Sequence, residues 1–200
     1  MPQAPELEDG EQYAGIRFRA VRMHGRKIRN VQFSDCTFDH CTFGGATFAS
    51  CTFTGCTFDT CDLSLMQPAG SRFMDVRFVD SKLVGVDWTR VDLVAKMALT
   101  VVFERCVVSQ ALFNGLNLRR LRLVDSVASE ADFSNADMSD SVCTGTDFAG
   151  ARFSDTNFTS ADLRRARGYR INPLANRVAK AKFTMPDAVG LLDGLGVVIE

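Results

Sequence analysis

The sequence predicts an all-β solenoid in which the chain turns a corner every five residues and four sides close one coil. Of the thirty positions spaced by five from Phe18 to Leu163, twenty-nine are apolar and Pro68 is the exception. All sixteen phenylalanines share this phase, and the positions two residues earlier are small or aliphatic in twenty-eight of thirty cases. A period of five fits neither the helical repeat of 3.6 nor the strand repeat of 2. We therefore expect one large and one small inward side chain per side, in a stack of roughly seven to eight coils at strand spacing.

Length and charge fit a single domain with three segments. Two hundred residues are enough for one sizeable core. We expect a polar, poorly ordered lead-in over residues 1–14, the solenoid over 15–167 and a capping and dimerisation segment over 168–200. The net charge of −1 argues against a generally basic nucleic-acid binder. Without an apolar run near 18 residues or a secretory leader, we expect a cytoplasmic protein that contacts neither a membrane nor nucleic acid directly.

The large inward side chains, sorted by a step of twenty, predict four ladders, one on each face. One face is predicted to carry Phe33, Phe53, Phe73, Leu93, Phe113, Phe133 and Phe153. A second is predicted to carry Phe18, Phe38, Phe58, Phe78, Ala98, Leu118, Met138 and Phe158. A third mixes methionine, phenylalanine, leucine and cysteine, and the fourth carries Ile28, Phe48, Pro68, Trp88, Val108, Ala128 and Phe148. No insertion breaks the period of five between residues 16 and 166, so the step of twenty is expected to hold throughout.

The cysteines raise the question of a metal site or a disulfide framework. Six of the seven occupy the small inward position, and only Cys143 lies elsewhere: Cys36, Cys41, Cys51, Cys56, Cys61 and Cys106. Zinc sites favour close CxxC pairs with further cysteines or histidines, whereas the spacing here is CxxxxC. An odd number of cysteines without a leader disfavours a secreted disulfide scaffold. We interpret these residues as small buried apolar side chains.

Two places depart from the ideal repeat. Pro68 occupies a large inward position, on the same predicted face as Trp88, the only tryptophan. In the segment 94–102, Lys96 takes the small inward position and Ala98 the large one. One interpretation is a locally bulged coil whose lysine reaches water. The other is a deformed patch that a partner recognises, with Pro68 and Trp88 as its candidate contact residues.

After residue 166 the period stops, and the C-terminal segment has the pattern of a cap. Pro186 suits the first turn of a helix and is followed by the acidic Asp187. A short amphipathic helix is expected to end at Gly194 or Gly196, and GVVIE to form a terminal strand. The apolar residues of this segment could cover the open end of the stack and also pair with a second copy. The predicted homodimer interface consists of Val189, Leu192, Leu195, Val197 and Ile199.

No catalytic motif is visible, and we expect a protein that is not an enzyme and has no cofactor, catalytic or metal site. A nucleophile needs a positioned base, and metal-assisted hydrolysis needs clustered ligands. His24 and His40 lie on repeat corners without a partner placed by any motif. Neither GxGxxG nor GxxxxGK[ST] occurs, so no phosphate cradle is indicated.

An acidic band over residues 125–162 is the clearest charge feature. It holds eight acidic residues against one base, Arg152, and the eight are Asp125, Glu130, Asp132, Asp137, Asp140, Asp147, Asp155 and Asp162. Spread over about two coils, this gives roughly 0.7 charges per Å, close to the roughly 0.6 per Å of duplex DNA. The band could act as a partial DNA mimic for a protein partner. Alternatively, the basic residues from Arg164 to Lys182 balance it and leave an ordinary solvated surface.

The repeat units ADFSN, ADMSD and CTFDT resemble the pentapeptide repeat proteins over residues 16 to 166. This resemblance implies a right-handed quadrilateral β-helix. The segments CDLSL, FMDVRFVDSKLVGVDWT and NRVAKAKFTMPDAVGLLDGLGVVIE are similar to the topoisomerase-protecting members, the albicidin-resistance proteins in particular and the Qnr quinolone-resistance proteins. That subgroup implies closure of a dimer by the C-terminal helix. Qnr-type members also have non-repeat loops that engage the enzyme.

The resemblance implies binding to bacterial DNA gyrase or topoisomerase IV and protection from an antibiotic that poisons the enzyme. Two other functions fit the same residues. The rod could be a rigid interaction scaffold for an unrelated protein, or a self-immunity protein of an antibiotic biosynthetic cluster. One scaffold hosts many partners, so fold analogy alone does not choose among them.

Overall fold

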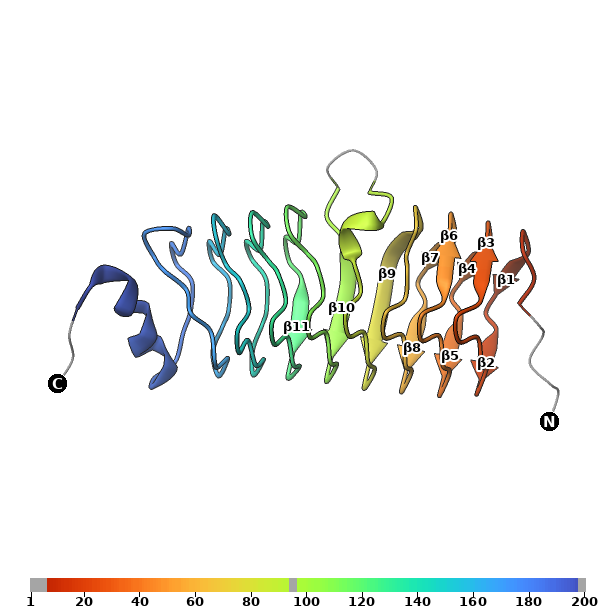
Figure 1. Cartoon of the computed structure of the whole chain (residues 1–200), viewed down its shortest axis with the longest axis horizontal. Helices are drawn as coiled ribbons and strands as arrows, with labels where there is room; N and C mark the ends of the chain where they lie inside the picture. The colour runs from red at the N-terminus through yellow and green to blue at the C-terminus, as the bar shows by residue number, and fades with distance from the viewer. Residues whose placement is uncertain (1–6, 94–96, 198–200) are drawn as a thin grey trace.

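The computed structural model describes residues 7–93 and 97–197 and forms a parallel β-solenoid. Figure 1 shows a rod of stacked coils with β1 near one end and a short helical segment at the other. This confirms the predicted fold class. The strands of the described residues are β1 (Gln12–Ala14), β2 (Arg17–Arg19), β3 (Lys27–Arg29), β4 (Gln32–Ser34), β5 (Thr37–Asp39), β6 (Thr47–Ala49), β7 (Thr52–Thr54), β8 (Thr57–Asp59), β9 (Arg72–Val79), β10 (Thr100–Glu104) and β11 (Arg122–Val124).

The step of twenty holds in the first half of the rod. Phe33 on β4 pairs with Phe53 on β7, and Phe53 pairs with Phe73 on β9. The ring centroids in both pairs lie 4.9 Å apart with nearly parallel planes. On the neighbouring face Phe38 and Phe58 stack at 4.5 Å. These contacts agree with the first halves of the predicted ladders.

One coil contains twenty-five residues, and this corrects the prediction that a step of twenty holds throughout. Phe78 pairs with Phe103, twenty-five residues later, and Asp87 pairs with Leu112. The step of twenty then returns, since Phe103 pairs with Leu123. The chain on both sides of residues 94–96 stands out from the rod as a side loop (Figure 1). Five added residues keep the phase of five, so the count along the sequence did not reveal them.

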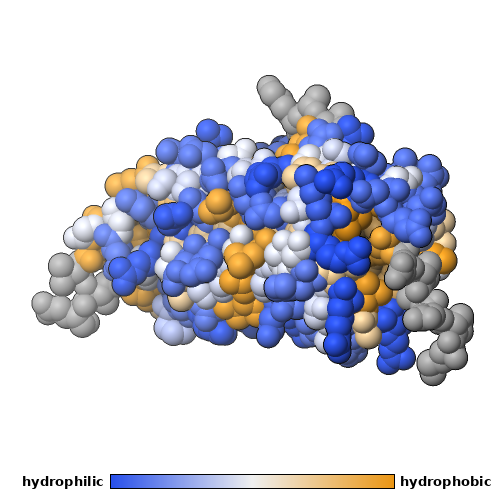
Figure 2. Space-filling view, turned by 45° about the vertical axis from the view of Figure 1, so that its right-hand side comes forward, coloured by the Kyte–Doolittle hydropathy of each residue, from blue (hydrophilic) through white to orange (hydrophobic). Residues whose placement is uncertain are grey.

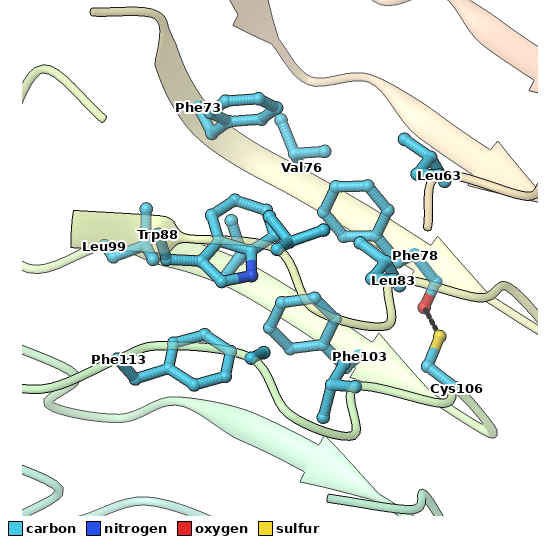
Figure 3. Close-up of a cluster of buried hydrophobic side chains, with 14 of the residues drawn as sticks. Leu63, Phe73, Val76, Phe78, Leu83, Trp88, Leu99, Phe103, Cys106 and Phe113 are labelled. Carbon is cyan, nitrogen blue, oxygen red and sulfur yellow. Dashed lines mark hydrogen bonds between the residues drawn. The ribbon is translucent and has the colours of Figure 1, made fainter. Parts of the chain in front are cut away.

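The insertion moves every later ladder by one face. Phe113 follows Trp88 rather than Leu93, with centroids 6.1 Å apart and planes 8° from parallel. Phe103 follows Phe78 rather than Ala98, at 5.3 Å. Figure 3 shows Trp88 among Phe73, Phe78, Phe103 and Phe113. The tryptophan therefore joins the phenylalanine stacks of the two halves.

The small inward position accepts buried hydrogen-bond donors. All seven cysteines are buried and free, which confirms the interpretation of their burial. The thiol of Cys106 donates to the carbonyl oxygen of Phe78 at 3.3 Å, as Figure 3 shows. Ser71, in the same position of another coil, donates to the carbonyl of Phe48 at 2.9 Å. Cysteine, serine and threonine fit here because each is small and can donate to the preceding coil.

The polar positions of the repeat form the turns. Corner residues adopt φ between +48° and +82° along most of the rod, a region that suits glycine, asparagine and aspartate. Aspartates before the large inward residue accept from the amide two residues later, as Asp132 does from Ser134 (2.9 Å) and Asp62 from Ser64 (3.0 Å). Such local bonds stabilise turns. These aspartates therefore have a structural role.

Both ends of the rod differ in detail from the prediction. Strand β1 pairs with β4, Leu7 is buried, and the Gly10 amide donates to the Arg29 carbonyl, so the first coil includes residues before the predicted boundary at 15. The C-terminal helix consists of two 3-10 turns, η2 (Asp187–Leu191) and η3 (Asp193–Leu195). Gly196 ends it with φ of +68°. The predicted terminal strand lies mainly outside the described residues. In the described part of the chain, no helix has the length and apolarity to cross a membrane.

Candidate partner-binding surfaces

The side loop leaves the rod from a firmly held base. The 3-10 turn η1 (Trp88–Arg90) is capped by Asp87, whose carboxylate accepts from the Thr89 amide at 3.0 Å. Two residues beyond η1, the Asp92 amide donates to the Ser71 carbonyl. The Asp92 carboxylate accepts from Arg72 at 2.7 Å. The departing chain is thus fixed to the preceding coil.

The returning chain is held by both neighbouring coils. The Leu99 amide donates to the carbonyl of Asn117 at 2.9 Å, and the Leu99 side chain is buried. The Thr100 hydroxyl accepts from the Asp75 amide at 3.0 Å. Met97, just before this return, is 62% exposed. The loop is therefore an exposed feature on a rigid base, which agrees with the prediction of a bulged coil over 94–102. Lys96 itself lies outside the described residues.

Trp88 and Pro68 are not surface residues, which corrects their prediction as partner contacts. Trp88 is 0% exposed and Pro68 is also buried. They share a predicted face, but the rings of Phe73, Phe78, Phe103 and Phe113 surround the tryptophan. Both residues occupy an inward position of the five-residue repeat, and that position already predicts burial. Their role is to fill the core beneath the loop.

The acidic band is spread around the rod. Asp132, Asp137, Asp147 and Asp162 lie on four different bridge ladders, so each is on a different side. The other four occupy corners with positive φ, and these are Asp125, Glu130, Asp140 and Asp155. Any single face of the rod therefore carries only some of the eight acidic residues. Figure 2 shows hydrophilic residues over most of the visible surface, with apolar patches between them.

Arginines neutralise much of this band. Five of the eight acidic residues form ion pairs: Asp125 with Arg165 (3.7 Å), Asp132 with Arg152 (3.0 Å), Asp140 with Arg119 (3.3 Å), Asp147 with Arg167 (3.0 Å) and Asp162 with Arg164 (2.6 Å). The Arg164 guanidinium holds the pKa of Asp162 below its ordinary value. The Glu130 carboxylate accepts a hydrogen bond from the side-chain amide of Gln110, and the Asp137 carboxylate accepts one from the side-chain amide of Asn157. The balanced-charge alternative therefore has direct structural support.

The C-terminal segment divides between covering the core and facing solvent. Leu191 packs against the core, and the ring of Tyr169 contacts that of Phe183 at 5.6 Å. Leu192, Leu195 and Val197 are exposed by 36%, 48% and 48%, and Val189 is half-buried. Ile199 lies outside the described residues. At the same end, Leu174 and Met185 are 76% and 72% exposed, and both were missed because they lie outside the helical pattern.

The two histidines have surroundings that suit a surface corner. His40 Nδ1 lies 2.5 Å from Asp39 Oδ1, and this hydrogen bond lowers the pKa of Asp39. His24 lies against Gly44 on the next coil. Among the described residues, no group of three or more histidines, cysteines or acids could hold a metal ion.

Comparisons with known proteins cover nearly the whole rod. A family model described as "Pentapeptide repeat region" matches residues 31–99, and one described as "Pentapeptide repeats (8 copies)" matches 102–140 and 136–167. The break between the two models coincides with the end of the side loop. No curated protein matched the sequence.

Two solved structures have a similar fold. Both are trypsin-treated forms of QnrB1, described as a plasmid-mediated fluoroquinolone resistance protein. The first is 22% identical with a TM-score of 0.61, and the second is 20% identical with a TM-score of 0.55. In each comparison the match covers 96% of this chain and 99% of the other. The two rods thus agree in length as well as in coil architecture.

Proposed function

The chain belongs to the pentapeptide repeat family, and from this premise we propose that it is a non-enzymatic protein that binds bacterial DNA gyrase or topoisomerase IV. Binding protects the enzyme from an antibiotic that poisons it, either a fluoroquinolone or an albicidin-like drug. The support is the resemblance of its segments to topoisomerase-protecting members and the likeness of the whole rod to a fluoroquinolone-resistance protein. The narrower similarity to albicidin-resistance proteins stays a prediction.

The observation that carries the proposal is the side loop. A regular solenoid presents nearly equivalent faces, whereas the coil of twenty-five residues marks one face at one height of the rod. Segments held on a rigid base are where binding residues concentrate. The Qnr-type resemblance assigns enzyme contacts to non-repeat loops. We therefore place the main contact at the loop rather than at Pro68 and Trp88.

In this proposal the acidic band has only a secondary role in binding the enzyme. Partial DNA mimicry would need negative charge gathered along one side of the rod. The eight acidic residues encircle the rod, and five are paired with arginines. We therefore expect the rod to imitate the dimensions of duplex DNA more than its charge. Association steered by charge weakens steeply with salt, so a weak salt dependence fits this version of the proposal.

We also propose that two copies pair through the C-terminal end to form a two-fold rod. The exposed side chains of Leu192, Leu195 and Val197, together with Leu174 and Met185, give this end an apolar surface. Such a patch on a soluble chain marks an interaction site. Light scattering should give the mass of a dimer, and a Leu192→Glu/Leu195→Glu variant should give that of a monomer. A monomeric mass for the unaltered chain would refute the pairing.

The test of the function is gyrase supercoiling at a fixed dose of ciprofloxacin or albicidin, with this protein titrated in. We expect rescue at near-stoichiometric protein, and the drug that responds identifies the subgroup. A loop variant with Met97→Ser and Asp92→Asn should lose rescue, whereas Arg22→Gln at the far end should keep it. Absence of rescue and of inhibition at large excess would favour the alternative of a scaffold for another partner.

A further inference from the structure

A second surface lies beside the base of the loop. It is a groove of about 650 Å³. Its floor is formed by residues 98–102, and because the side chains of Leu99 and Val101 are buried, Ala98 and Val102 supply its apolar surface beside the exposed Thr100. Its rim carries Asp75 and four arginines, and these are Arg77, Arg119, Arg120 and Arg122. Arg119 is already paired with Asp140 outside the groove. The volume lies within the range of roughly 300 to 1,000 Å³ that ligand pockets occupy.

The arginines are placed in register by the coils. Arg77 pairs with Val102, and Val102 pairs with Arg122, so these two arginines stand on one face two coils apart. Two coils correspond to roughly 10 Å at strand spacing. In a peptide with the polyproline II conformation, which has three residues per turn, side chains three residues apart lie on the same face and are separated by about 9 Å. A segment lying along the rod could thus offer one carboxylate to each arginine.

Glu104 shows that this pair of arginines already binds a carboxylate. Its two oxygens lie 3.0 Å from Arg77 and 4.0 Å from Arg122, and its side chain is 21% exposed. A guanidinium has five N–H donors, so this one carboxylate leaves donors on both arginines unused. Arg120 is exposed at a corner and, among the described residues, has no carboxylate within ion-pair distance. The groove therefore holds more cationic donors than its own acids satisfy.

We propose that this groove binds a peptide segment in the polyproline II conformation, in which carboxylates three residues apart are separated by apolar side chains. The arginine rim matches the carboxylates, since planar guanidinium groups recognise them with paired hydrogen bonds. The apolar floor matches the side chains between them. A nucleic-acid backbone fits less well, because it would need cations in a continuous row and would leave the floor without an apolar partner. The proposal concerns the chemistry of the segment and holds whichever protein supplies it.

The test is fluorescence polarisation with the full-length chain and a labelled nine-residue peptide, with glutamate at every third position and leucine or valine between. We expect saturable binding that an Arg120→Gln/Arg122→Gln variant weakens about tenfold or more. The matched control, Arg22→Gln/Arg26→Gln, removes the same charge from exposed residues at the other end of the rod and should leave binding within about twofold. Glu104→Gln should strengthen binding, because it removes the competing carboxylate. Emission from buried Trp88 verifies the fold of each variant.

Three results would overturn the proposal. One is equal weakening by the control pair, which would mean that the peptide responds to net charge alone. Another is undiminished binding of a peptide with glutamine in place of glutamate. The third is displacement of the peptide by duplex DNA at an equal or lower concentration, which would assign the groove to a phosphate backbone. Failure of gyrase protection would leave this proposal intact, because the peptide assay contains no gyrase.

Discussion

Replacing Trp88 by phenylalanine should change stability little, whereas replacing it by alanine should be costly. The indole is fully buried, and among the described residues its Nε1 has no hydrogen-bond partner. Trp88→Phe loses the transfer free energy of the removed ring atoms, about 1 kcal/mol, and leaves a cavity of about 40 Å³, which at about 24 cal/mol per Å³ costs about 1 kcal/mol more. Removing a buried, unpaired donor recovers about 1 to 3 kcal/mol. The two effects nearly cancel, or they favour phenylalanine slightly.

Trp88→Ala removes the ring that joins the two halves of the aromatic core. Large aromatic residues cost about 3 to 5 kcal/mol on replacement by alanine, and loss of the unpaired N–H offsets part of this. We therefore expect about 2 to 4 kcal/mol of destabilisation. Urea unfolding followed by far-ultraviolet circular dichroism measures both variants without using the tryptophan signal. Destabilisation of Trp88→Phe by more than about 2 kcal/mol would refute the account of the unpaired N–H.

Three further predictions use other parts of the rod. In a variant with Asn in place of Asp132, Asp137, Asp140 and Asp147, each side chain keeps an oxygen that can accept the turn hydrogen bonds, so the rod should remain folded. Loss of drug protection by this variant in the supercoiling assay would show that the acidic band contacts the enzyme. Burial raises the pKa of the Cys143 thiol from its ordinary 9.0 to about 12. Maleimide should therefore label the chain near pH 8 only as fast as it unfolds, and the free energy of unfolding should fall as pH rises from about 9 toward 12. Rapid labelling of the native chain would contradict this. Gly168→Ala should destabilise by about 1 to 3 kcal/mol in urea unfolding, because its φ is +69° and a Cβ would lie 3.0 Å from the backbone nitrogen of Ala149. Gly115→Ala, with φ of +71° and nothing within 4 Å of the added Cβ, should lose about 1 kcal/mol or less, and equal losses would refute the clash.

The candidate surfaces were only partly predictable. The sequence places Leu192, Leu195 and Val197 at an apolar end, and the structure exposes them. It also groups eight acidic residues, but counting charge along the chain says nothing about direction. A coil sends successive groups of five to successive sides, so a dense run becomes a ring around the rod. The arginine groove was not predicted, since it assembles residues from three consecutive coils, the middle one being the return of the loop.

Outside the side loop, the sequence by itself determined which side chains point inward, because the alternation of burial within each side is a local property of the chain; at the loop the buried residue is Leu99 rather than Leu93 or Ala98. Phe18, Cys36 and Trp88 are all buried for this reason, without reference to the rest of the fold. Only the tertiary structure decided how many groups of five close each coil. That number depends on parallel pairing between distant segments, as between Phe78 and Phe103, and an extra group of five preserves the local pattern while it projects as a loop. The position of the loop, the faces of the acidic residues and the groove all follow from this nonlocal pairing.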